Sequence, residues 1–134
     1  MHNRRQAEYG DFLPELKADL QETLAIASRA GVRKESIILD PGVGVGFAKT
    51  REQNLEVLAN LGGLRELGCP VLLGASRKSV IGLTLDVPVT ERLEGTLVTT
   101  VFAVLSGCSH VRVHDVKENV RAVRMAEAIA EYER

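Results

Sequence analysis

The chain has 134 residues, of which 45% are hydrophobic and 26% charged, and its formal net charge is −1. This is the composition of a soluble globular protein, and we expect a single domain spanning residues 1–134. The near-neutral charge and the 4% share of aromatic residues argue against a nucleic-acid partner. No apolar stretch approaches the roughly 20 residues of a membrane span, and no apolar segment follows Arg4-Arg5 as in a secretory signal. The cytoplasm is therefore the expected location.

The first predicted element is a helix from about Phe12 to Ala30, with an apolar stripe at the spacing of helical turns. Asp11 is placed to cap its start and Pro14 fits its first turn. Gly31 is well placed to end it. Before this helix, Met1-His2-Asn3 has the character of the last residues of a strand.

Three short apolar runs follow, at Ile37–Leu39, Val71–Gly74 and Val111–Val113. Buried parallel strands have this form, and helix-like segments lie between the runs. With a strand end at Met1–Asn3, the pattern predicts an α/β fold of four βα units with parallel strands. A closed barrel of eight such units needs about 250 residues, so the chain holds about half of one.

The intervening helices have recognisable start and stop signals. Thr50 and Gln53 form a capping box that predicts a helix start, and Gly62-Gly63 predicts a break. A short helical piece is expected to run to about Leu85. Thr90 is expected to cap a helix over Glu91–Leu105, with Gly107 closing it. A second capping box, Asp115-Val116-Lys117-Glu118, is expected to open the last helix.

Charged and polar side chains follow each of the three apolar runs. In parallel sheets the carboxyl ends of the strands are the place where ligands bind, so these side chains should converge on one edge. The sequence therefore predicts a single site at that edge. Its members are Asp40, Ser76, Arg77, Lys78, Arg112, His114 and Asp115.

Asp40 precedes a glycine-rich loop, Gly42–Gly46. Its carboxylate could accept two parallel hydrogen bonds from the N–H edge of a pterin or guanine ring, or it could cap an Asp-Pro-Gly turn; both interpretations stay open. The loop is not a dinucleotide fingerprint, because the position of the third glycine is Phe47. We expect instead a mobile loop over a pocket.

Lys78 could bind an anion or a ring carbonyl, or belong to a solvated basic turn. Arg112 and His114 are two residues apart on one strand, so their side chains leave from the same face. Together they suit an anion such as phosphate, with an exposed histidine as the alternative. Cys69 and Cys108 are expected to be small buried hydrophobic residues.

These motifs, taken together and in order, resemble the dihydropteroate synthases across essentially the whole chain. The implied fold is the C-terminal half of a TIM barrel. The implied activity condenses 6-hydroxymethyl-7,8-dihydropterin diphosphate with p-aminobenzoate, releasing diphosphate in folate biosynthesis, and makes the protein a sulfonamide target. The segments that carry the resemblance are Met1–Arg4, Leu39–Gly42, Gly46–Thr50, Gly74–Ser79, Glu91–Gly95 and Arg112–Val116.

The resemblance also implies roles for individual residues. Asp40 and Lys78 would be catalytic: Asp40 would bind the N–H edge of the pterin and stabilise a carbocation, and Lys78 would contact the pterin and the p-aminobenzoate side of the pocket. Arg112 and His114 would hold the leaving diphosphate, with Arg112 also against the pterin ring. The remaining substrate-binding positions would be Phe47 on the p-aminobenzoate ring, Ser76 near its carboxylate, and Gly74.

Two departures from the family pattern stand out. The stretch Val43–Phe47 is two residues longer than the family's usual Asp-Pro-Gly, apolar, Gly-Phe, which shifts Phe47 relative to Asp40. The front half of the family's barrel is missing, and with it the residue that would hold Mg²⁺ together with the diphosphate. No metal ligand is therefore expected on this chain.

A half-barrel leaves sheet edges and apolar surface uncovered, so we expect a homodimer or a complementary N-terminal half as partner. The isolated chain should be weakly active or inactive. Two other interpretations stay open: a non-catalytic, self-associating pterin-binding half-barrel, and a domain of the folate-dependent methyltransferase type. The Ser-Arg-Lys and Arg-Val-His-Asp elements favour the synthase.

Overall fold

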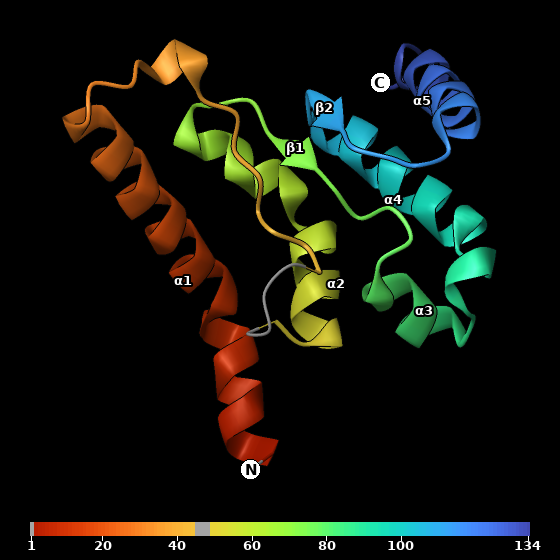
Figure 1. Ribbon diagram of the computed structural model, residues 1–134, viewed down its shortest axis with the longest axis horizontal. Coiled ribbons are helices and arrows are strands. Elements are labelled where there is room, and N and C mark those ends of the chain that lie inside the picture. The colour runs from red at the N-terminus through yellow and green to blue at the C-terminus, as the bar shows by residue number, and fades with distance from the viewer. Residues whose placement is uncertain (1, 45–48) are drawn as a thin grey trace.

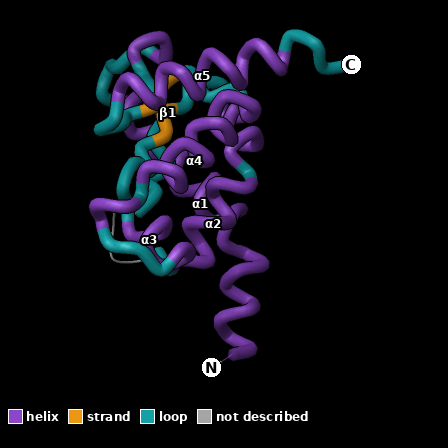
Figure 2. The backbone as a smooth tube through the Cα atoms, turned by 90° about the vertical axis from the view of Figure 1, so that its right-hand side faces the viewer, coloured by secondary structure: helices purple, strands orange, loops and turns teal. Residues whose placement is uncertain are grey.

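The computed structural model describes residues 2–44 and 49–134, and it has an α/β architecture with parallel strand pairing (Figure 1). Helix α1 lies along one side of the molecule, and its N-terminal end extends beyond the other elements. Figure 2 shows how little of the chain is strand and how closely the helices surround it. The elements are α1 (His2–Arg29), η1 (Lys34–Ser36), α2 (Arg51–Ala59), η2 (Leu61–Leu67), β1 (Leu72–Leu73), α3 (Ser79–Leu85), η3 (Val89–Glu91), α4 (Leu93–Ser106), β2 (His110–Val111) and α5 (Val116–Ala130), where η denotes a 3-10 helix.

Three chain segments pair in parallel at the centre, at the positions of the three predicted strands. Strand β1 pairs with β2, with Leu72 opposite His110. Leu39 forms a single parallel bridge with Val71 on the other side of β1. The regular pairing is shorter than the apolar runs. The order in space is therefore Leu39, β1, β2, and each segment leads into a helix.

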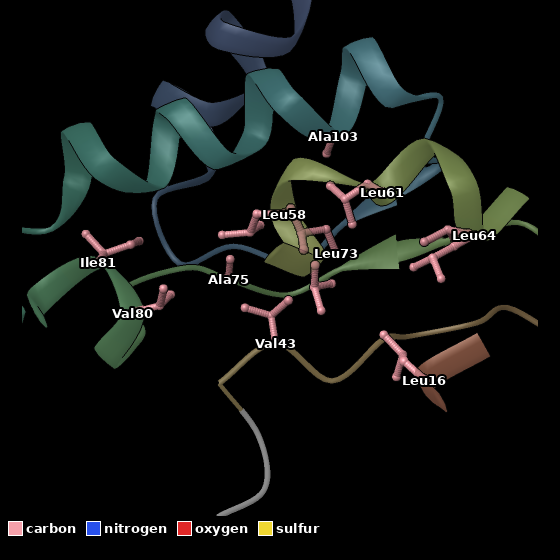
Figure 3. Packing of buried hydrophobic residues seen from close by; sticks show 12 residues of the cluster. Leu16, Val43, Leu58, Leu61, Leu64, Leu73, Ala75, Val80, Ile81 and Ala103 are labelled. Atoms are coloured by element: carbon pink, nitrogen blue, oxygen red, sulfur yellow. The ribbon is translucent and has the colours of Figure 1, made fainter. Parts of the chain in front are cut away.

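The main hydrophobic cluster joins this strand layer to the helices around it (Figure 3). Val43, only 1% exposed, packs into the same cluster as Leu73 and Ala75. The loop after Leu39 is thus anchored by its own valine directly beside the end of β1. The other buried members are Leu16, Val57, Leu58, Leu61, Leu64, Val71, Val80, Ile81 and Ala103.

The start of the first helix was predicted wrongly. His2 and Asn3, expected at the end of a strand, lie in α1, and Pro14, expected in the first turn, lies inside the helix. A three-residue strand needs a neighbouring strand for its backbone hydrogen bonds, whereas a helix satisfies its own. The end of the helix was predicted correctly, since Gly31 follows it with φ +87°.

The predictions for the later helices had mixed outcomes. The capping box of Thr50 and Gln53 is confirmed in both directions, and α2 ends before Gly62-Gly63. Thr90, in contrast, lies in η3 and caps nothing, because α4 begins only at Leu93. The second capping box is also wrong: Asp115 makes no side-chain cap on α5, since its carboxylate binds an arginine of another segment.

Within the described part of the chain, no helix has the length and apolar character needed to cross a membrane.

Candidate functional site

The carboxyl ends of the paired segments bring three of the predicted side chains together. Gly74 ends the β1 segment, and a Cβ added there would lie 3.8 Å from Nζ of Lys78 and 3.9 Å from Cβ of Arg112. Asp40 and Arg112 both lie close enough to Lys78 to act on its charge. Asp40, Lys78 and Arg112 therefore share one edge, and Gly74 lies beside two of them.

Lys78 is half-buried between the loops that follow Leu39 and β1. Its Nζ donates a hydrogen bond to the carbonyl oxygen of Val43, at 2.7 Å. Burial lowers the pKa of Lys78, opposed by the carboxylate of Asp40 and assisted by the cation of Arg112. Gly44 leaves space for the lysine stem, because a Cβ there would lie 2.7 Å from Cδ of Lys78. The φ of +69° at Gly44 also favours glycine.

The turn after Asp40 is held by its own carboxylate and by a second lysine. The amide of Gly42 donates to Oδ1 of Asp40 at 2.7 Å, as in an Asx turn. Lys49 donates from Nζ to the carbonyl oxygens of Pro41 and Gly42. Burial lowers the pKa of Lys49, with Asp40 opposing and Lys78 assisting that shift. The turn-capping interpretation of Asp40 is thus observed, with one carboxylate oxygen engaged in the turn.

Asn54 extends this support from the first turns of α2. Its Oδ1 accepts a hydrogen bond from the amide of Gly44 at 3.0 Å, and the residue is 4% exposed. Neither Lys49 nor Asn54 was assigned a role from the sequence. The only signal for Asn54 is a polar residue on the buried side of a helix, which becomes visible once that side is known.

Ser76 and His114 meet across the ends of β1 and β2. Oγ of Ser76 lies 2.8 Å from Nδ1 of His114 and accepts a hydrogen bond from the His114 amide at 3.1 Å. Ser76 is 5% exposed, whereas His114 is exposed. The two predicted site residues are therefore one hydrogen-bonded unit.

Arg77, between Ser76 and Lys78, has a left-handed backbone with φ +59°. Its amide donates to Oγ1 of Thr96 at 3.0 Å, and its carbonyl accepts from Nη1 of Arg92 at 2.9 Å. Its guanidinium makes two hydrogen bonds to the carboxylate of Asp115, which raise the pKa of Arg77. Two other segments, the start of α4 with its N-cap Arg92 and the residue before α5, thus fix this turn, which sets the directions of Ser76 and Lys78.

Thr96 and Arg92 were also assigned no role from the sequence. Thr96 is fully buried, and its hydroxyl donates to the carbonyl of Arg92 while accepting from Arg77. A threonine within a helix carries no sign of such a partner. Arg92 lies in the Glu91–Gly95 segment that supports the family resemblance, but that resemblance implied no contact for it.

Phe47 lies outside the described residues. The role implied for Ser76 at the p-aminobenzoate carboxylate and the substrate-binding role implied for Gly74 stay predictions. Within residues 2–44 and 49–134 no three histidine, cysteine or acidic side chains cluster as a metal site would require. An apolar cavity of about 470 Å³ lies elsewhere, between α2, α3 and α4, and includes none of the predicted site residues.

Comparisons with known proteins identify the family of the chain. The sequence profile of the family described as "Pterin binding enzyme" matches residues 1–114. A dihydropteroate synthase of Clostridium beijerinckii is 54% identical over 130 residues, covering 96% of this chain and 48% of the relative. A dihydropteroate synthase of Bacillus subtilis is 49% identical, covering 96% of this chain and 45% of the relative. The chain thus spans about half the length of the curated relatives it matches.

Solved structures give the same result for the fold. The dihydropteroate synthase of Clostridium difficile, crystallised in the presence of pteroic acid, superposes with a TM-score of 0.84 at 50% identity, covering 92% of this chain and 46% of that one. The enzyme of Yersinia pestis in a sulfonamide drug complex gives a TM-score of 0.86 at 36% identity, covering 92% of this chain and 44% of that one. The chain belongs to the pterin-binding enzyme family, within which its relatives are dihydropteroate synthases.

Proposed function

We propose that the chain is the C-terminal half of a dihydropteroate synthase and carries the pterin and diphosphate contacts of that enzyme. The observation that supports this most is the convergence of Asp40, Lys78 and Arg112 around Gly74, with Ser76 and His114 paired beside them. The relatives that are 49–54% identical to the chain over 129–130 aligned residues are named for this activity. The same convergence on a chain without such relatives would support only an anion site.

The reaction breaks the bond between the pterin methylene carbon and the diphosphate oxygen, and forms a bond from that carbon to the amine of p-aminobenzoate. The amine then loses a proton. Asp40 would accept hydrogen bonds from the N–H edge of the pterin, and its charge would stabilise positive charge that develops on the ring and methylene. Arg112 and His114 would stabilise the negative charge of the departing diphosphate.

Lys78 would exchange its present acceptor, the carbonyl of Val43, for the carbonyl oxygen of the pterin. The exchange would need little movement, because the lysine stem is already confined by Gly44 and Gly74. Burial, which lowers the pKa of Lys78, also removes water that would weaken a new hydrogen bond there. Phe47 and Ser76 would complete the p-aminobenzoate side, and sulfonamides would compete for it.

The finer architecture forms part of the same proposal. The chain would supply the second half of a (β/α)8 barrel, with the three parallel segments at Leu39, β1 and β2 among its strands. It would pair with an N-terminal half or with a second copy of itself. Mg²⁺ would act through the diphosphate. Of the two carboxylates described at this rim, Asp40 binds its own turn and Asp115 pairs with Arg77, so the protein ligand of Mg²⁺ would come from the other half.

The experiment measures diphosphate release from the pterin diphosphate and p-aminobenzoate, with the chain alone and with an added N-terminal half of the Bacillus subtilis relative. We expect little turnover from the chain alone and turnover after complementation. Lys78→Met should abolish the restored activity, while Lys34→Met should leave it unchanged, because Lys34 lies beside Gly68, before the amino end of β1. Folded, assembled halves without turnover would contradict the synthase assignment.

A further inference from the structure

The Ser76 hydroxyl has two hydrogen-bonding neighbours among the described residues, and both belong to His114. Its oxygen accepts the backbone amide proton of His114, and its remaining neighbour in hydrogen-bond distance is Nδ1 of the same histidine, at 2.8 Å. Ser76 is 5% exposed, so its own proton needs an acceptor inside the protein. No other acceptor for this proton is found among the described residues, and Nδ1 is in position to take it.

A ring nitrogen that accepts a hydrogen bond carries no proton, so the proton of the neutral imidazole must lie on the other nitrogen. We propose that Ser76 is a positioning residue that fixes His114 as the Nε2–H tautomer, so that the ring offers an N–H donor to the diphosphate. This deepens the proposed function, on which its second part rests.

The geometry leaves the Nε2–H of His114 available to donate to a ligand. His114 is exposed, and Nε2 makes no hydrogen bond within the described part of the chain. The loops that follow β1 and β2 leave the strands on the same side of the molecule (Figure 1). With Nδ1 and the backbone amide both bound to Ser76, the ring cannot rotate without losing a buried contact. An anion at this edge would therefore meet an N–H, not a lone pair.

The same chain contains a second serine–histidine contact that lacks this constraint. At the opposite end of β2, Oγ of Ser109 lies 2.7 Å from Nδ1 of His110. Here both residues are exposed, and the hydroxyl has a second acceptor, the carbonyl of Val71 at 3.3 Å. Because both side chains are exposed, water can also take the place of Ser109 or His110 in this hydrogen bond. This pair should not select one tautomer, which makes it a matched control.

The first test is a two-bond ¹H–¹⁵N correlation spectrum of the histidine rings at an alkaline pH, where imidazoles are uncharged. We expect a single Nε2–H form for His114 and a mixture of forms for His110 in the same spectrum. Ser76→Ala should convert His114 to a mixture, and Ser109→Ala should leave it unchanged. A proton on Nδ1 of His114 in the unaltered chain would overturn the proposal, with no need for a variant to fold.

The second test measures binding of inorganic diphosphate by calorimetry, with inorganic phosphate as a comparison. Ser76→Ala should weaken diphosphate binding about 5-fold, the size expected for one misplaced hydrogen-bond donor. Ser76→Thr should restore it, and Ser109→Ala should have no effect.

Outcomes of the two tests are separable. A fixed tautomer without diphosphate binding would refute the proposed function while leaving the tautomer assignment standing. A tautomer of His114 that survives Ser76→Ala would refute the role of Ser76 even if the chain binds diphosphate.

Discussion

The two ends of α3 carry the same unusual backbone conformation for different reasons. Arg77, just before the helix, has φ +59°, and Asp86, just after it, has φ +56°. Such a conformation costs a residue with a side chain about 1–2 kcal/mol. Arg77 is held in it by Thr96, Arg92 and Asp115. Asp86 is exposed and makes only a helix C-cap, its amide donating to Gly82.

This difference shows where strain serves the site. The turn at Arg77 separates Ser76 from Lys78, and their directions depend on its shape, so the surrounding structure stabilises it through three residues of two separate segments. The turn at Asp86 needs only to end a short helix, for which glycine would serve better. Backbone strain of similar size is thus structurally supported at one end and merely tolerated at the other.

The largest expected effect comes from removing the buried acceptor at the Arg77 turn. Thr96→Val deprives the amide of Arg77 of its buried acceptor, which should lower the free energy of unfolding by about 2 kcal/mol. Thr99→Val is the control: Thr99 is also a buried threonine of α4, 9% exposed, but its replacement loses only a bond to the carbonyl of Thr96. Urea denaturation measures the free energy of unfolding of both variants. Equal losses of stability would mean that Thr96 does not stabilise the turn.

A smaller effect is expected at the arginine that joins the two ends of α3. Arg92 donates to the carbonyl of Arg77 and more weakly to that of Val87, and its guanidinium lies against Gly82. Arg92→Met keeps the apolar stem but removes the donors, and should cost about 1–1.5 kcal/mol. Amide hydrogen exchange should accelerate at Lys78. Unchanged exchange there would show that Arg92 does not hold the turn.

The comparison itself can be tested with glycine at each position. Asp86→Gly should stabilise the chain by about 1 kcal/mol, because glycine adopts this conformation freely and the change removes a negative charge at a helix C-terminus. Arg77→Gly gains similar backbone relief but loses its pair with Asp115, so no net stabilisation is expected. Thermal melting compares the stability of the two variants. An equal rise in melting temperature would mean that the turn at Arg77 has no more structural support than the turn at Asp86.

The smallest effect concerns the lysine that follows Arg77. Burial lowers the pKa of Lys78 below its unfolded value of 10.5, so over the interval between the two values the folded state binds fewer protons than the unfolded one. The stability of the chain relative to Lys78→Met should therefore rise as the pH increases through this alkaline interval. Denaturation of both proteins across pH 8–11 measures this difference in stability. A difference that does not change with pH would mean that Lys78 is fully solvated.

The outcomes of the sequence predictions separate by the range of the interactions involved. The three strand positions, the capping box at Thr50 and the helix ends at Gly31 and Gly107 were predictable, because each rests on neighbours within a few residues. Asp115 shows the limit: its sequence context favoured a helix cap, but a guanidinium 38 residues away offered a stronger partner. The strand predicted at His2 and Asn3 was wrong for a similar reason, because a strand needs a neighbouring strand that the local sequence does not guarantee.

For the site, the sequence placed Asp40, Lys78, Arg112 and His114 at one edge through strand periodicity alone. The partners that orient two of these residues came only from the tertiary structure: Val43 for Lys78, and Ser76 for His114. The supporting residues Lys49, Asn54, Arg92 and Thr96 had no distinguishing pattern. Periodicity reports which way a side chain leaves its element, whereas a hydrogen bond requires two atoms to meet within about 3 Å. That meeting is decided by how the elements pack.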